Sequence, residues 1–321
     1  MKTLGVTPDT AGLRDKQAAA ACGMPLLLDA YKHIGHQHGL SIAQILVTLG
    51  DFENHRRFLN TKNTLERLMA SGVLPIINEN DTITTEEIRV GDNDRLAARV
   101  AQMIQAEHLV ILTGVDGLYD RPPSEPGARL VETVHDVSEY LDVTTTVGAL
   151  GTGGMLTKLQ AANMAQNAGC HTLIANGERD RPVSSVLKGE RPCTTCVAHD
   201  EPLDSWAAWL TSRLQMAGSM VISAEAAAAV LRGERGVGRD DVISLSGRFS
   251  KGDVVHLYDQ DGVERARGMT DFSSEQAEIL VRNPDLSVKA LFGYQSRGVL
   301  VESTNLIALD DRHIQWKPEA A

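Results

Sequence analysis

Cysteine, long apolar runs and basic charge are all scarce in this 321-residue sequence, and each scarcity excludes a class of protein. Four cysteines are too few for a disulfide framework in a chain of this length. No apolar run approaches the roughly 18 residues of a membrane-spanning helix, and the N-terminus lacks the pattern of a secretion signal. Because 31 Lys and Arg face 42 Asp and Glu, a protein that grips nucleic-acid phosphates is disfavoured. We therefore expect a soluble cytoplasmic protein with no membrane segment.

The cysteines also offer little for metal or redox chemistry. Cys193 and Cys196 form a CxxC pair in the stretch R-P-C-T-T-C-V. A structural zinc site needs two further Cys or His ligands, and only His199 is near. A redox CxxC usually opens a helix after a strand, whereas this stretch has an extended pattern. We expect buried or loop cysteines and no metal held by protein side chains alone.

Two polar clusters follow one another in residues 74–94. The segment opens with a short apolar run that is typical of a buried strand, and it leads directly into Asn78, Glu79, Asn80 and Asp81. The second cluster, residues 91–94 (G-D-N-D), precedes a helix that we expect over 94–106. Ligands of open α/β sheets sit at the carboxyl ends of strands and at helix N-termini, so the clusters predict a site for a small polar ligand. The alternative is that these are ordinary turn and N-cap residues.

A glycine-rich stretch, G-A-L-G-T-G-G-M-L-T-K, occupies residues 148–158. Such a turn ahead of a helix can wrap a phosphate, because its backbone N–H groups point outward and no Cβ blocks the approach. Lys158 follows by about one helical turn and could neutralise charge on a phosphoryl group in transfer. The spacing differs from that of a P-loop, and Leu159 follows the lysine. A flexible loop with a surface lysine is the alternative.

Strands alternate with helices through the first 200 residues, which predicts an α/β fold with an open, mainly parallel sheet sandwiched by helices. The expected strands are 41–48, 74–77, 109–113 and 171–175, and the expected helices are 11–40 (broken near 23–25), 51–71, 94–106 and 159–168. We expect a linker and helix over 201–238. A mostly β module should follow over 239–321, with a hairpin at Asp261-Gly262.

Together the two stretches predict phosphoryl transfer to a small acid. One offers amides and carboxylates for the acceptor, and the other offers glycines and a lysine for a nucleotide phosphate. Such catalysis is mostly positioning and charge stabilisation, with Mg²⁺ bridging the phosphates of ATP.

These motifs resemble the glutamate 5-kinase family of the amino acid kinase superfamily. The matching stretches are I-N-E-N-D at 77–81, V-G-D-N-D at 90–94, L-T-x-V-D-G-L-Y at 112–119 and G-T-G-G-M-x-T-K at 151–158. Two further stretches, S-G-R-F-S-K-G-D at 246–253 and L-F-G-Y at 291–294, resemble the PUA domain that bacterial members carry. The resemblance covers essentially the whole chain, and it assigns 1–200 to the kinase domain and 239–321 to the PUA-like domain.

The resemblance implies transfer of the ATP γ-phosphate to the side-chain carboxylate of L-glutamate, the first step of proline synthesis. It implies that Asp81 and Asn93 bind glutamate with Asn78 and Asp92 close by, and that Lys158 and Asp94 are catalytic. The ATP ligands that it implies are Thr113, Gly114, Thr152, Gly153, Gly154, Met155, Leu156, Thr157 and Lys158. A homo-oligomer inhibited by proline is also implied.

Three departures from the family pattern stand out. Family members begin with a Lys-Gly-Thr/Ser strand and a second strand ending in Ser-Gly-Ala. We therefore expect that about 50 residues are missing, which would expose apolar faces that soluble proteins rarely tolerate. Gly114 stands where the family usually has Asp, and Leu156 where a small Ser is common. From these departures we expect very low kinase activity and altered ATP affinity.

Two alternatives stay open. The first is another small-acid kinase of the superfamily, acting on aspartate, N-acetylglutamate or uridylate. The second is a non-catalytic or regulatory homologue whose PUA-like module binds RNA, a role that the net charge of −11 disfavours.

Overall fold

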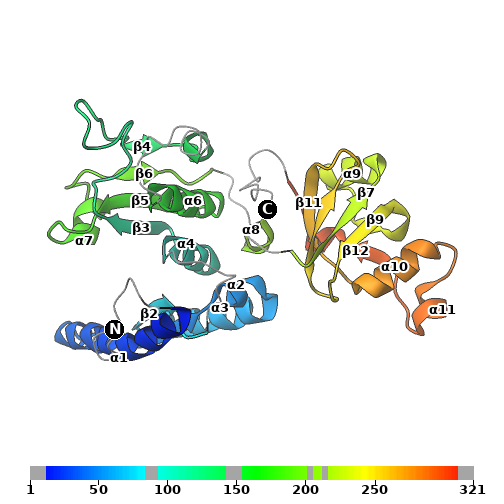
Figure 1. The fold of residues 1–321 in the computed structure, drawn as a ribbon, viewed down its shortest axis with the longest axis horizontal. Coiled ribbons are helices and arrows are strands. Elements are labelled where there is room, and N and C mark those ends of the chain that lie inside the picture. The colour runs from blue at the N-terminus through cyan, green and yellow to red at the C-terminus, as the bar shows by residue number, and fades with distance from the viewer. Residues whose placement is uncertain (1–11, 84–92, 142–153, 201–204, 212–215, 310–321) are drawn as a thin grey trace. The chain divides into compact units, whose positions relative to one another are not determined.

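The computed structural model describes residues 12–83, 93–141, 154–200, 205–211 and 216–309. The chain divides into two compact units, Met1–Pro202 and Leu203–Ala321 (Figure 1). Among the described residues, none of the helices combines the length and apolar character that a membrane crossing requires.

The first unit opens with a parallel strand pair and its helices. The elements are α1 (Leu13–Gln37), β1 (Ser41–Val47), α2 (Leu49–Glu53), α3 (His55–Ala70) and β2 (Val73–Glu79). β1 and β2 pair in parallel from Ser41↔Val73 to Val47↔Glu79. Both strands therefore end at the same edge.

Two helix predictions in this region differ from the structure. The helix expected over 51–71 is divided at Asn54, whose extended backbone ends α2 and whose side chain accepts a hydrogen bond from the Arg57 N–H at 3.0 Å. That bond makes Asn54 the N-cap of α3. The break expected near 23–25 does not occur, because α1 runs through Pro25. Strong helix formers on both sides, alanines before Pro25 and three leucines after it, favour continuation.

The rest of the first unit is built on a four-stranded sheet. Its elements are α4 (Asn93–Ile104), β3 (His108–Thr113), β4 (Thr133–Val134), α6 (Gly154–Asn167), β5 (His171–Asn176), α7 (Pro182–Leu187) and β6 (Thr194–Cys196). The strand order is β3-β5-β6-β4. Two of the pairings are parallel, and only β5 with β6 is antiparallel. The predicted α/β class with a mainly parallel sheet is confirmed, although the described strands of the first unit form two sheets rather than one.

Small side chains let α4 and α6 approach closely. Ala98 and Ala101 of α4 form one buried cluster with Ala161 and Ala165 of α6, and Leu109 of β3 belongs to the same cluster. Because alanine side chains are short, the backbones of the two helices can pack at close range. This packing sets the relative position of the two helix N-termini.

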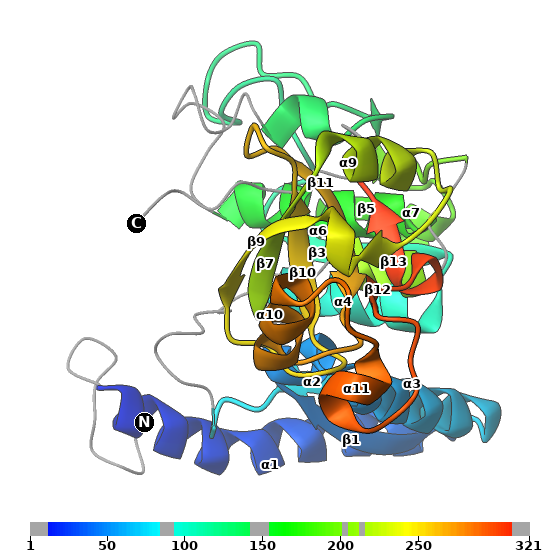
Figure 2. The same ribbon diagram turned by 90° about the vertical axis from the view of Figure 1, so that its right-hand side faces the viewer.

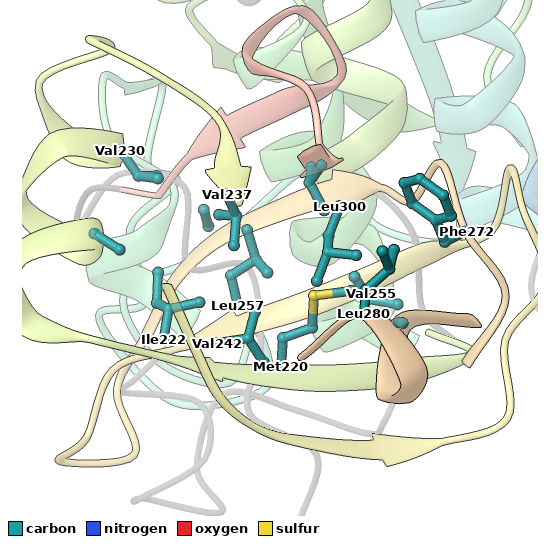
Figure 3. Packing of buried hydrophobic residues seen from close by; sticks show 14 of the residues in the cluster. Met220, Ile222, Val230, Val237, Val242, Val255, Leu257, Phe272, Leu280 and Leu300 are labelled. Carbon is teal, nitrogen blue, oxygen red and sulfur yellow. The ribbon is translucent and has the colours of Figure 1, made fainter. Parts of the chain in front are cut away.

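The second unit is a five-stranded sheet with short helices. The elements are α8 (Ser205–Thr211), β7 (Gly218–Ile222), α9 (Ala224–Leu231), β8 (Val237–Gly238), β9 (Val242–Gly247), β10 (Val254–Tyr258), β11 (Glu264–Met269), α10 (Ser274–Arg282), α11 (Val288–Phe292), β12 (Val299–Val301) and β13 (Leu306–Ala308). The sheet order is β13-β11-β10-β7-β9, and Figure 2 shows β7 between β9 and β10. β8 and β12 form a separate pair. The buried core of the second unit includes Met220, Ile222, Leu257, Phe272 and Leu300 (Figure 3).

The predicted hairpin at Asp261-Gly262 is confirmed, since β10 and β11 pair antiparallel across it and Gly262 has φ +77°. The expected domain boundary at 239 lies inside this unit. Residues 201–238, expected as a linker and helix, contain β7 and α9, and both contribute buried side chains to the core. The sheet of the second unit therefore begins at residue 218.

Candidate functional site

The carboxyl ends of β3 and β5 lie side by side. Thr113 pairs with Asn176 in parallel register, and the Gly177 N–H donates to the Thr113 carbonyl oxygen at 2.8 Å. Gly114 follows Thr113 as an exposed residue with open space where a Cβ would stand. This edge is where a parallel sheet ordinarily holds its ligand.

Lys158 and Asp94 meet between the first turns of α6 and α4. The Lys158 ammonium donates to Asp94 Oδ2 at 2.7 Å, and both side chains are only 15% exposed. Asp94 lies one turn before Ala98 and Lys158 one turn before Ala161, so the alanine packing of the two helices brings the charges together. The Thr157 hydroxyl lies 3.4 Å from the same carboxylate oxygen and 2.9 Å from the Gly154 carbonyl oxygen. The structure thus brings Asp94 together with Thr157 and Lys158, which follow it in the sequence by 63 and 64 positions.

The residues predicted to bind glutamate lie at the end of β2 and the start of α4. Asn78 is half-buried, and its amide lies 3.3 Å from the Met24 sulfur of α1. Asp81 is exposed in a turn, and Asn93 is exposed as the first residue of α4. α4 packs against β2, so these side chains belong to neighbouring elements.

Some predicted site residues lie outside the described part of the chain. These are Asp92, Thr152 and Gly153. Of the other residues predicted to bind ATP, Gly154 is exposed at the start of α6, while Met155 is partly buried against an apolar cluster that includes Leu118 and Leu159. Leu156 is partly buried in the same helix turn.

A cavity of about 150 Å³ lies where β5 ends. Its lining residues are Asp116, Asn176, Arg179, Pro182, Val186, Arg191 and Pro192. Arg179 Nη2 donates to both carboxylate oxygens of Asp116 at 3.2 Å. Neither arginine was singled out from the sequence, although N-G-E-R directly after a buried strand is a signal that could have done so.

All four cysteines are free thiols, and two of them, Cys170 and Cys196, are buried. Cys196 belongs to β6 and is fully buried, and burial raises the pKa of its thiol to about 12. Burial also raises the pKa of Cys170 to about 11. Both thiols are therefore protonated and poorly reactive near neutral pH.

Comparison with known proteins agrees with this architecture. A model of the amino acid kinase family matches residues 2–176, and a PUA domain model matches residues 218–291. The chain therefore belongs to the amino acid kinase family and carries a PUA domain.

Similar proteins indicate which kind of amino acid kinase this chain is. A glutamate 5-kinase of Paramagnetospirillum magneticum is 38% identical over 309 residues, which cover 95% of this chain and 83% of that protein. Glutamate 5-kinases of Caulobacter vibrioides and Rhodospirillum rubrum are each 40% identical, over 310 and 316 residues, and this chain covers 81% and 83% of them. Within the family, the chain belongs with the glutamate 5-kinases.

Proposed function

We propose that this protein transfers the γ-phosphate of ATP to the side-chain carboxylate of L-glutamate and forms L-glutamyl 5-phosphate. The observation that carries the proposal is the Lys158–Asp94 ion pair between the first turns of α6 and α4. It lies in a chain that is 38–40% identical to glutamate 5-kinases over 81–83% of their length.

Lys158 is proposed to stabilise the phosphoryl group in transfer. Its ammonium is largely shielded from water, so its charge acts on a developing negative charge more strongly than a surface lysine would. Asp94 and the alanine packing hold the ammonium in place before the substrates arrive. The positive end of the α6 dipole, which begins at Gly154, also favours phosphate.

Mg²⁺ fits this donor set as the partner of ATP. Carboxylate oxygens are the ligands that Mg²⁺ prefers, and Asp94 offers one beside the lysine. When bound, the ion neutralises charge on the phosphate oxygens. The chain's own contribution is to hold Lys158 and Asp94 at fixed positions.

The polar residues of β2 and α4 are proposed to bind glutamate. The amides of Asn78 and Asn93 can donate to its carboxylates, and Asp81 can accept from its α-ammonium group. Asp92 would add a further acceptor. Thr113, Gly114 and residues 152–158 are proposed to contact the nucleotide.

The experiment is phosphotransfer by the purified chain with MgATP, followed by coupled ADP release. Trapping the acyl phosphate with hydroxylamine as γ-glutamyl hydroxamate identifies the product. We expect L-glutamate to raise ADP release, and L-aspartate, N-acetyl-L-glutamate and UMP to have no effect. The increase in ADP release on adding L-glutamate should be measurable even at the low rate that the sequence predicts. Equal ADP release with and without glutamate would refute the proposal and favour a non-catalytic role.

Three further properties are proposed from family membership alone. They are assembly as a homo-oligomer, inhibition by proline, and a cytoplasmic location. Sedimentation equilibrium and a proline titration of the glutamate-dependent rate test the first two.

A further inference from the structure

α4 is the element shared by the two halves of the proposed site. On one side it packs against β2 and α3, which belong to the half that would hold glutamate. On the other side it packs against β3 and α6, which belong to the half that would hold the nucleotide. Figures 1 and 2 both show α4 between α3 and β3.

The tie between α4 and α6 is the ion pair and alanine packing already described. The tie between α4 and the other half is a second ion pair, Arg99–Glu53. Arg99 Nη2 donates to Glu53 Oε1 at 3.1 Å, and the two side chains are 3% and 14% exposed. Arg99 is one of the few charged residues of the described chain that is almost fully buried.

Glu53 is attached to the strand pair through a short, capped connection. It is the last residue of α2, which begins two residues after β1 ends. The Thr48 N–H and hydroxyl both donate to Asp51 Oδ2, at 2.7 and 2.8 Å, and this capping box fixes the first turn of α2. Val47 accepts from the Asn80 N–H at 2.7 Å, directly beside the predicted glutamate residues. Glu53 is therefore linked to the end of β2 through the Thr48 cap and β1.

We propose that Glu53 and Arg99 form a positioning pair for phosphoryl transfer. The inference rests on the proposed function. A charge-assisted bond between buried groups has a narrow range of favourable geometries, and breaking it is costly because both charges are largely shielded from water. The pair therefore fixes the distance from the end of β2 to the Asp94–Lys158 end of α4. Misplacement of reacting groups by about 1 Å can lower a rate about 100-fold.

Three variants test the pair. Glu53→Gln keeps the size of the side chain and removes its charge, Arg99→Met removes the partner, and the double variant Glu53→Arg/Arg99→Glu exchanges the charges. The control is Arg57→Met, which removes the neighbouring Arg57–Asp51 pair, where the arginine side chain is 65% exposed. Far-UV circular dichroism of each variant shows whether it folds.

We expect Glu53→Gln and Arg99→Met to lower the glutamate-dependent kcat by about 10- to 100-fold. The KM for MgATP should change by less than about threefold, because the pair is proposed to orient the reacting groups and not to bind MgATP. Arg57→Met should keep both constants, and the charge exchange should recover part of kcat. A purely structural role would instead lower the amount of folded protein and leave kcat per folded molecule unchanged.

Two outcomes overturn the inference and are distinguishable. If the parent is active and folded Glu53→Gln keeps its kcat, the positioning role is wrong and the proposed function stands, whatever Arg99→Met does. If parent and Arg57→Met both lack glutamate-dependent turnover, the proposed function fails, and the positioning role fails with it.

Discussion

Lys158 is the residue on which the chemistry of the proposed site depends most. Its ammonium is held by one carboxylate at 2.7 Å in a largely dehydrated position. Methionine at this position keeps most of the length of the lysine side chain and removes its charge. We expect Lys158→Met to lower kcat by about 10²- to 10³-fold, the usual cost of losing one transition-state donor. Single-turnover formation of glutamyl hydroxamate measures the chemical step directly.

The matched control for Lys158 is an exposed lysine of the same unit. Lys188 follows α7 and is exposed. Lys188→Met should leave kcat and the KM for MgATP unchanged. A Lys158→Met variant that matches this control would show that the ion pair with Asp94 serves only the packing of α4 on α6.

Gly114 is predicted to lie beside the nucleotide, at a position where the resemblance to glutamate 5-kinases implies an aspartate. No atom lies within 4 Å of a Cβ built there, so the first carbon of an added side chain enters open space. We expect Gly114→Asp to lower the KM for MgATP several-fold, because it supplies the acidic side chain that the resemblance implies at this position. Titration of the glutamate-dependent rate with MgATP measures this. An unchanged or higher KM would mean that the missing carboxylate does not limit nucleotide affinity.

At the scale of elements, the Thr194 side chain of β6 is hydrogen-bonded to the turn that follows β3. The buried Thr194 hydroxyl accepts from the Leu118 N–H and donates to the Val131 carbonyl oxygen, both at 2.7 Å. Gly117 passes directly over this residue. A Cβ at Gly117 would overlap Thr194 Oγ1 and would lie 2.8 Å from the Thr194 backbone nitrogen. The turn can keep its path only with glycine at this position.

We therefore expect Gly117→Ala to destabilise the first unit by about 1–3 kcal/mol, the range of an overpacked core site. Urea unfolding followed by far-UV circular dichroism measures the change. Gly114→Ala is the control three residues away, because its Cβ enters open space. Equal unfolding midpoints for Gly117→Ala and the parent would contradict the close approach of Gly117 to β6.

Elements with strong periodicity could be predicted from the sequence, and short ones could not. β3 and β5 are apolar runs bounded by polar turns, so their type and position were evident. β7 was missed because five residues, G-S-M-V-I, carry too little pattern to separate a strand from a linker. Asn54 is a common N-cap residue, but only its extended backbone shows that it divides one expected helix into α2 and α3.

At the scale of the whole molecule, the sequence motifs predicted the candidate site. They did not predict the contacts that support it. The contact of Lys158 with Asp94 follows from two motifs that the family resemblance had already joined. The Arg99–Glu53 pair had no such signal, because a charged residue between Ala98 and Val100 is ordinarily a solvated helix position. Its burial depends on a contact between residues 46 positions apart, which only the packed structure creates.

The second unit contains a partly buried carboxylate network around Glu264. Glu264 Oε1 lies 2.7 Å from His256 Nδ1 and accepts from Arg267 Nε at 2.7 Å. Burial alone would raise the pKa of Glu264, but the hydrogen bonds from His256 and Arg267 outweigh it and hold the pKa below its ordinary value of 4.5. Folding therefore favours the ionised form of Glu264. This contribution to stability is fully present above pH 4.5 and is lost as the pH falls through the lower pKa of the folded state.

Tryptophan emission can follow this effect in the full chain, because all three tryptophans lie in the second unit. Trp209 is almost fully buried, and its helix, α8, packs on β11 and β13 of this unit. We expect its environment to change when the unit unfolds. We expect the urea midpoint of this emission to fall as the pH drops from about 5 toward 3, because protonation removes the negative charge of Glu264 from the network.

Glu264→Gln should be less stable than the parent at neutral pH, and its urea midpoint should depend less on pH in the acid range. Glu278→Gln removes an exposed carboxylate paired with Arg282 and should follow the parent. Parallel acid curves for Glu264→Gln and the parent would mean that the acid sensitivity of the second unit arises from other carboxylates, such as Asp241, whose pKa is also lowered.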